Sequence, residues 1–146
     1  MLSKKAKYAI KALIFLAKAS NDEKDLVLIA EISEKERIPK KFLEQILLEL
    51  RRNAILVSRR GKEGGYKFGK NPSEISMGQV IRIVDGPLAM IPCVSHLFYE
   101  KCEECISEET CTIRNVMKVV RDGTANILDS TSIQDLVDGN GFAKLM

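Results

Sequence analysis

The apolar residues near the start of the chain recur at helical spacing. Between Lys4 and Ala19, isoleucine, leucine and alanine side chains return every three or four positions, with lysines between them. This period predicts an amphipathic helix with one buried face. A short helix is expected over about residues 29–35, and the run RIPKKFLEQILLELRRN predicts another, with Pro39 in its first turn. In that helix the expected buried stripe consists of Leu43, Ile46, Leu47 and Leu50.

The segment after these helices has the pattern of a β-hairpin. The two short helices are joined tightly around Arg37 and Ile38, which is typical of a helix-turn-helix. The following run ILVSRRGKEGGYKFG has β-branched residues, a glycine-containing loop and then Tyr66–Phe68, so it predicts a hairpin with a basic tip. A basic hairpin directly after a helix-turn-helix is typical of a wing, although an ordinary turn would also accommodate the Gly-Gly pair.

A winged helix offers two DNA-binding elements. The exposed start of its second short helix contacts base edges in the major groove, and basic side chains of the wing contact phosphates or the minor groove. Residues 1–70 carry 17 Lys or Arg and 9 Asp or Glu, a net charge of +8, whereas residues 71–146 carry 6 and 11, a net charge of −5. The positive part favours binding to a polyanion over a merely solvated lysine-rich surface. The candidate DNA-binding residues are Lys40, Lys41, Glu44, Gln45, Arg59, Arg60 and Lys62.

A long amphipathic helix is expected in the C-terminal part of the chain. The run TIRNVMKVVRDGTANILDS has a stripe at i, i+3, i+4 spacing, which suits packing on a second copy of the same helix. Gly123 costs up to about 1 kcal/mol relative to alanine but allows close helix approach. Ser132 and Asp135 fit a capping box that opens a last short helix. The stripe comprises Ile113, Val116, Met117, Val120, Thr124, Ile127 and Leu128.

All four cysteines lie in the run CVSHLFYEKCEECISEETC, residues 93–111, with the spacing C-x8-C-x2-C-x5-C. The pair Cys102 and Cys105 forms a C-x2-C knuckle that suits zinc, yet a structural zinc site usually has two such pairs. Thioredoxin-like chemistry is disfavoured because no βαβ pattern surrounds the motif and glutamates crowd it. Thiolates on a loop also suit an iron–sulfur cluster. A free thiol switch remains a further alternative.

Composition limits the class of protein. Few aromatic residues and no tryptophan favour a helical protein, and no apolar run approaches the roughly 20 residues needed to cross a bilayer. Lys11 interrupts the apolar stretch near the N-terminus, which argues against a signal peptide. We therefore expect a cytoplasmic protein that does not bind membranes. Because the cytoplasm is reducing, the clustered cysteines favour metal or redox chemistry over structural disulfides.

The motifs IPKKFLEQIL, RGKEGGY and EISMGQVIRIVDGP resemble the Rrf-type family of bacterial winged-helix regulators, and the resemblance covers nearly the whole chain. The resemblance implies a homodimeric transcription regulator, not an enzyme, that binds an imperfect palindrome in double-stranded DNA. In relatives the residues that match Lys41, Glu44 and Arg60 contact DNA. Relatives often have a small hydroxyl residue where Lys41 stands, so the preferred DNA site can differ.

The resemblance also implies a cofactor, an iron–sulfur cluster of the 2Fe–2S type. Cys93, Cys105 and Cys111 match the three cysteines of cluster-binding relatives, although the gap between the first two is longer here. The histidine that one relative uses as fourth ligand is replaced by Arg114, and the acidic residue that another uses is replaced by Lys7. Cys102 is therefore the expected fourth ligand, and His96 is second.

The sequence thus predicts a mainly α-helical protein with a small β-hairpin wing. We expect a winged helix-turn-helix domain at 1–87, a cysteine-containing sensor loop at 88–111, a dimerisation helix and short C-terminal helix at 112–138, and a flexible tail at 139–146. The expected function is repression or activation of transcription under control of the cluster. Alternatives are a clusterless regulator that uses the cysteines as a thiol switch or zinc site, or that responds to a metabolite or partner protein. A small redox carrier that never binds DNA is a third hypothesis.

Overall fold

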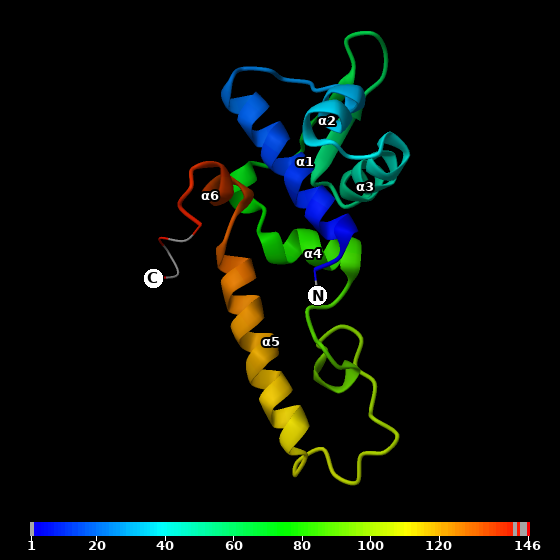
Figure 1. Cartoon of the computed structure of the whole chain (residues 1–146), viewed down its shortest axis with the longest axis vertical. Coiled ribbons are helices and arrows are strands. Elements are labelled where there is room, and N and C mark those ends of the chain that lie inside the picture. The colour runs from blue at the N-terminus through cyan, green and yellow to red at the C-terminus, as the bar shows by residue number, and fades with distance from the viewer. Residues whose placement is uncertain (1, 142, 144–145) are drawn as a thin grey trace.

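The computed structural model describes residues 2–141, Ala143 and Met146, so the predicted tail at 139–146 lies partly outside the described residues. The helices in chain order are α1 Lys4–Asn21, α2 Ile29–Glu36, α3 Lys40–Arg52, α4 Met77–Asp85, α5 Thr112–Ser130 and α6 Ile133–Val137. The strands are β1 Leu56–Arg59 and β2 Gly65–Phe68, and the 3-10 turns are η1 Pro72–Glu74 and η2 Pro92–Val94. The mainly helical fold with a small two-stranded sheet is confirmed (Figure 1).

Helix α1 forms the centre of the N-terminal domain and packs against α3, α4 and α6. Its buried face is made of small and branched apolar residues, as the helical period predicts. The helix begins after Ser3, whose hydroxyl accepts a hydrogen bond from the backbone N–H of Ala6 at 2.9 Å. Such an N-cap satisfies one of the donors that the first turn leaves free.

The connection from α2 to α3 is a turn of unusual backbone geometry. Arg37 ends α2 with a φ of 54°, in the left-handed region that glycine adopts more readily. The hydroxyl of Ser33 donates to the carbonyl oxygen of Ile38 at 2.6 Å and holds the turn. Pro39 lies at the N-cap, one position before the first residue of α3 rather than inside its first turn. The predicted buried stripe of α3 is confirmed at Leu43, Ile46, Leu47 and Leu50.

The wing is an antiparallel hairpin with Leu56 opposite Phe68 and Arg59 opposite Gly65. A backbone bridge to Val27 extends the sheet beside β2. Gly65 has a φ of 142°, and a Cβ added there would lie 2.5 Å from the carbonyl oxygen of Val27. The close approach of these two backbones therefore requires glycine at this position.

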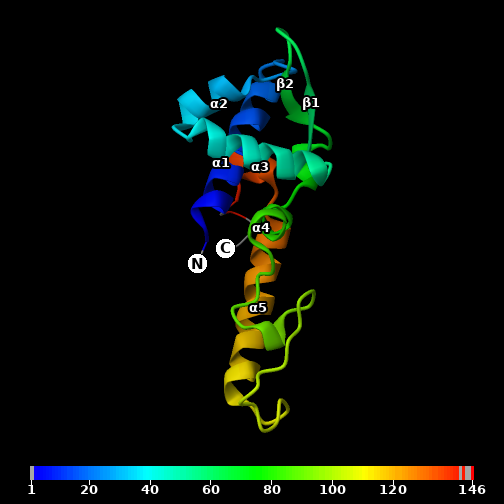
Figure 2. The same ribbon diagram turned by 90° about the vertical axis from the view of Figure 1, so that its right-hand side faces the viewer.

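Helix α5 extends away from the N-terminal domain, and the cysteine-containing segment runs beside its far end (Figures 1 and 2). Two backbone hydrogen bonds hold its near end, from the N–H of Met77 to the oxygen of Thr131 and from the N–H of Ile133 to the oxygen of Ile75. The predicted capping box of Ser132 and Asp135 opens α6. Among the described residues, no helix is both long and apolar enough to span a membrane.

Candidate DNA-binding surface and cysteine cavity

The four candidate residues of α3, namely Lys40, Lys41, Glu44 and Gln45, lie on the exposed face of the helix. Because the opposite face is fully buried, the helix has one orientation in the domain and presents these side chains to solvent. Two positive side chains in the first turn also add to the positive potential of a helix N-terminus. This surface has the charge and hydrogen-bonding groups that phosphates and base edges require.

The wing presents a second basic surface. Arg59, Arg60 and Lys62 are exposed at the end of β1 and in the loop that follows it. A Cβ added to Gly64 would lie 2.3 Å from the carbonyl oxygen of Arg59, so the tight loop depends on glycine. The hairpin rises from the end of α3 (Figure 2), and Arg51 of α3 donates to the hydroxyl of Ser58 in β1 at 2.9 Å. This bond fixes the wing relative to the helix.

The basic side chains of this surface form no ion pair with carboxylates in the part of the chain that the structure describes. Within the described residues, ion pairs engage Lys5, Lys11 and Lys24 but none of the candidates Lys40, Lys41, Arg59, Arg60 and Lys62. The seven candidate residues thus lie on α3 and the neighbouring wing, and the five basic ones have their charges available to an external anion.

All four cysteines line one open cavity of about 630 Å³ beside the first turn of α5. Cys93 is buried in η2, Cys105 and Cys111 are half-buried, and Cys102 is exposed. All four are free thiols. In the described part of the chain, no three His, Cys, Asp or Glu side chains converge closely enough to hold a metal ion. The cysteines are therefore gathered around one space without forming a closed ligand set.

Hydrogen bonds and burial raise the pKa of two of these thiols. The Cys102 thiol donates to the Glu104 carboxylate at 3.1 Å, and this bond is the main reason why the pKa of Cys102 is raised. Burial, followed by the proximity of Cys111 and Glu108, raises the pKa of Cys105. Metal binding at these positions would release protons, because thiolates are the ligands.

Cys111 has a further role as the N-cap of α5, where its sulfur accepts a hydrogen bond from the backbone N–H of Arg114 at 3.5 Å. The Arg114 side chain lines the same cavity, and its Nε lies 3.8 Å from Glu108 Oε1. The Tyr99 hydroxyl donates to that oxygen at 2.6 Å, which raises the pKa of Tyr99. Among the described residues the buried Arg114 Nε has no hydrogen-bond acceptor.

His96 does not line the cysteine cavity. It borders a separate small cavity of about 40 Å³ with Arg82 and Arg121. The donor set at the cysteine cavity is thus four thiols, and this set fits an iron–sulfur cluster in kind because thiolates are its usual ligands. The four sulfurs would have to approach one another before they could share one cluster. Cys102 and Cys105 lie in a segment without helix or strand.

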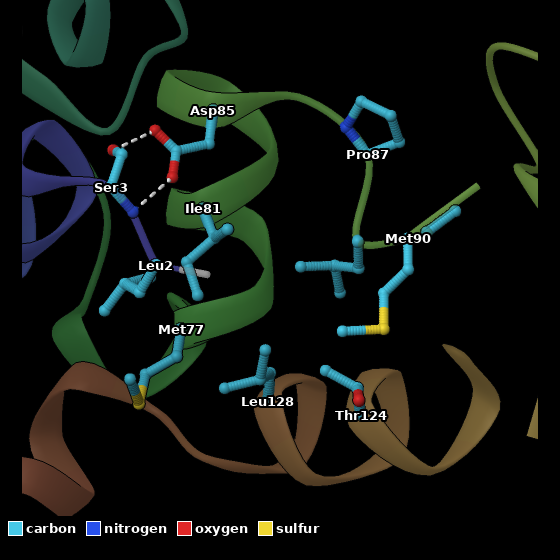
Figure 3. Close-up of a pocket in the computed structure, with 11 residues that line it drawn as sticks. Leu2, Ser3, Met77, Ile81, Asp85, Pro87, Met90, Thr124 and Leu128 are labelled. Carbon is cyan, nitrogen blue, oxygen red and sulfur yellow. Dashed lines mark hydrogen bonds between the residues drawn. The ribbon is translucent and has the colours of Figure 1, made fainter. Parts of the chain in front are cut away.

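The apolar stripe of α5 divides into two parts. Thr124 and Leu128 line an open cavity of about 790 Å³ together with Met77 and Ile81 of α4 and Met90 of the segment that follows α4 (Figure 3). Val119, which the predicted stripe omitted, is 72% exposed, and within the described chain no residue of α5 is buried. A contiguous exposed apolar face marks an interaction surface. Its exposed members are Ile113, Val116, Val119, Val120 and Ile127.

A helix-turn-helix, a basic wing and a protruding amphipathic helix together define a winged-helix DNA-binding regulator. Comparisons with known proteins agree with this class. Residues 2–139 match the Rrf2 family, described as iron-dependent transcriptional regulators. The chain therefore belongs to the Rrf2 family, and its relatives are transcriptional regulators rather than enzymes.

Individual relatives resemble the chain over most of its length. An HTH-type transcriptional regulator from Rhodobacter capsulatus, described as rrf2-like, is 40% identical over 148 residues, which cover 100% of this chain and 99% of the relative. The HTH-type transcriptional regulator IscR from Pectobacterium atrosepticum is 31% identical, and the match covers 94% of this chain and 79% of IscR. The structure of CymR, the global cysteine regulator of B. subtilis, superposes with a TM-score of 0.76 at 28% identity and covers 94% of this chain and 96% of CymR.

Proposed function

We propose that this protein is a homodimeric, sequence-specific transcription regulator that acts in the cytoplasm and whose DNA affinity is controlled at the cysteine cavity by an iron–sulfur cluster. The single observation that carries the proposal is the combination, in one chain, of an exposed basic winged helix and four free thiols around one cavity. The bound cluster would supply a redox-active centre that oxidants can alter. The chain's own residues would supply the ligands, the DNA-binding surface and the connection between them.

Each subunit would bind one half of an imperfect palindrome. The side chains at the start of α3 would contact base edges, with Glu44 accepting from a cytosine amino group and Lys41 donating to guanine or phosphate. Arg60 of the wing would reach into the minor groove, where a narrow groove attracts arginine. A two-fold axis through the exposed face of α5 would place the two copies of α3 on successive half-sites.

The DNA proposal is tested by selecting a binding duplex from a random pool and then measuring the affinity of variants at several salt concentrations. Arg60→Ala should cost about 1–3 kcal/mol of binding free energy and lower the slope of log affinity against log salt by about one. Lys118→Ala is the matched control, because this exposed lysine lies on α5, away from the proposed DNA surface. Equal affinities for wild type and Arg60→Ala would remove the wing from the proposed mechanism.

The cofactor proposal is tested by anaerobic purification, followed by an optical spectrum and by iron, sulfide and zinc analysis. Cys93, Cys105 and Cys111 would be ligands, with Cys102 as the fourth. We expect serine at any of the first three positions to abolish iron retention, and serine at Cys102 to lower it. A colourless protein that takes up no iron on reconstitution would overturn the cluster proposal.

A second candidate is a clusterless regulator in which the same cysteines bind zinc or form a thiol switch. The observation that favours a clusterless regulator is that the four cysteines of the described chain are free thiols and that no three candidate ligands converge closely enough to hold a metal ion. Zinc at one ion per subunit would support the zinc form. Loss of DNA binding after mild oxidation of iron-free protein, reversed by a thiol reductant, would support the switch.

A further inference from the structure

Arg121 is an almost buried cation in the middle of α5. Only 11% of its side chain is exposed. Its Nη1 donates to the backbone carbonyl oxygen of Val94, and its Nε and Nη2 donate to Asp122 Oδ1 at 2.8 and 2.6 Å. A guanidinium is rarely buried unless its donors have partners, so these contacts account for its position.

The carbonyl that Arg121 binds belongs to the turn that contains Cys93. Cys93 is 8% exposed and Val94 is 2% exposed, and η2 packs against α5. The turn is closed by the backbone N–H of Ser95, which donates to the oxygen of Pro92 at 2.9 Å. The residues from 96 to 104 that follow it are all exposed. The turn that contains Cys93 is thus held by its contact with α5, whereas the residues after it are exposed.

The ion pair with Asp122 does not explain the burial of Arg121. Asp122 is the next residue along the helix and its side chain is 55% exposed, so this pair could form equally well in solvent. The oxygen of Val94, in contrast, lies in a buried residue and needs a donor. A charged donor gives a stronger hydrogen bond than a neutral one.

We infer that Arg121 is a positioning residue that holds the Cys93 turn on α5 and so keeps Cys93 at the edge of the cysteine cavity. The structural role of Arg121 does not depend on the proposed function. Only its consequence rests on that function, namely that Cys93 acts as a ligand or redox thiol. Because the bond joins the turn to α5, a movement of Cys93 toward the other cysteines must stretch this bond or carry α5 with it.

The test measures how fast each cysteine of the reduced, metal-free full-length protein reacts with N-ethylmaleimide, with the sites resolved by peptide mass spectrometry. In the wild type, Cys93 should react slowest, because it is the one buried thiol among the four cysteines. Arg121→Met keeps the bulk of the side chain but removes the donors. We expect it to accelerate Cys93 by about tenfold or more, since a charged hydrogen bond then no longer opposes local opening, while Cys102 keeps its rate.

Two further variants and one control complete the experiment. Arg121→Gln, which is too short to reproduce the bond, should accelerate Cys93 as Arg121→Met does, and it decides the outcome if the methionine variant does not fold. Arg121→Lys keeps a long cationic donor and should restore part of the protection. Lys118→Met removes an exposed charge from the same helix and should leave the Cys93 rate unchanged.

A Cys93 rate within twofold of the wild type in Arg121→Met or Arg121→Gln would overturn the inference. So would an equal acceleration at all four cysteines accompanied by a lower melting temperature, because that pattern reports global destabilisation. The labelling uses protein without iron, so it can succeed when reconstitution fails. Failure of the proposed cluster function and failure of the inferred Arg121 role are therefore separate results.

Discussion

Replacing Gly78 by alanine would place a methyl group inside the contact between α4 and α5. A Cβ at this position would lie 2.0 Å from Asp129 Oδ1 and 3.0 Å from Arg82 Nη1. Those two side chains form a bidentate ion pair between the helices, with Arg82 Nη1 at 2.6 Å from Oδ1 and Nη2 at 2.9 Å from Oδ2. The new methyl group and the carboxylate cannot both occupy this space.

The opposing effects can be compared in magnitude. Alanine is favoured over glycine by about 1 kcal/mol in a helix interior, and by less at Gly78, which is the second residue of α4. Against this, the methyl group forces the Asp129 carboxylate out of its contact, and the cost is set mainly by the ion pair, because both side chains can move into solvent. The ion pair itself contributes about 0.5–1 kcal/mol, because its two side chains are 33% and 44% exposed and are screened by solvent. We therefore expect Gly78→Ala to lower the free energy of unfolding by up to about 1 kcal/mol, which for a chain of this size lowers the melting temperature by up to about 4 °C.

The assay is thermal unfolding followed by circular dichroism for the wild type, Gly78→Ala, Asp129→Ala and the double variant. Once Asp129 is truncated, the obstacle is gone and Gly78→Ala should become stabilising by about 0.5–1 kcal/mol. The sign of the Gly78→Ala effect thus reverses between the two backgrounds, which a double-mutant cycle measures directly. If Gly78→Ala stabilises the protein equally in both backgrounds, the reasoning about the α4–α5 contact is refuted.

Three more predictions concern separate parts of the molecule. The Arg82 hydrogen bond lowers the pKa of the Asp129 carboxyl. The ion pair therefore stabilises the fold fully above the pKa of Asp129 in the unfolded chain, about 4. This stabilisation is lost as the pH falls through the lower pKa that Asp129 has in the folded protein. In urea unfolding, the stability difference between the wild type and Asp129→Asn should be full at pH 7 and shrink below about pH 4; a constant difference would contradict this. Arg37→Gly should raise the free energy of unfolding by about 0.5 kcal/mol in the same assay, because the left-handed backbone penalty outweighs the added freedom of the unfolded chain; a decrease would mean that the Arg37 side chain itself stabilises the turn. Val120→Asp should convert the proposed dimer to monomer in sedimentation velocity without lowering the helix content, and an unchanged sedimentation coefficient would place the two-fold contact elsewhere.

The parts of the fold that depend on local periodicity were predictable from the sequence. The buried stripe of α3, the hairpin around Gly64 and Gly65 and the capping box of Ser132 are each set by residues within one or two turns of one another. Contacts between distant residues carry no such signal. Arg82 and Asp129 are 47 positions apart, and Arg121 and Val94 are 27 apart, so neither pair follows from spacing.

The apolar stripe of α5 also shows that local periodicity does not predict contacts between distant residues. Its period predicted an apolar face on this helix, but a period does not tell what covers that face. Thr124 and Leu128 line a cavity against α4 of the same chain, whereas Val116 and Val120 remain exposed. The grouping of the four cysteines around one cavity was likewise expected, while the placement of His96 beside Arg121 depends on how the loop folds back on α5.

The position of α5 decides how any chemistry at the cysteines could reach the DNA-binding surface. The helix has 19 residues and is therefore about 28 Å long. Cys111 caps its first turn, Arg121 holds the Cys93 turn at its middle, and Asp129 joins its last turn to α4. Helix α4 in turn packs against α3. A hydrogen-bonded helix transmits a displacement along its length better than a loop does, because its backbone bonds resist bending. A change in the cysteine segment that shifts α5 by a small angle would thus move α4 against α3, and the DNA affinity would change without any direct contact between the cavity and the DNA.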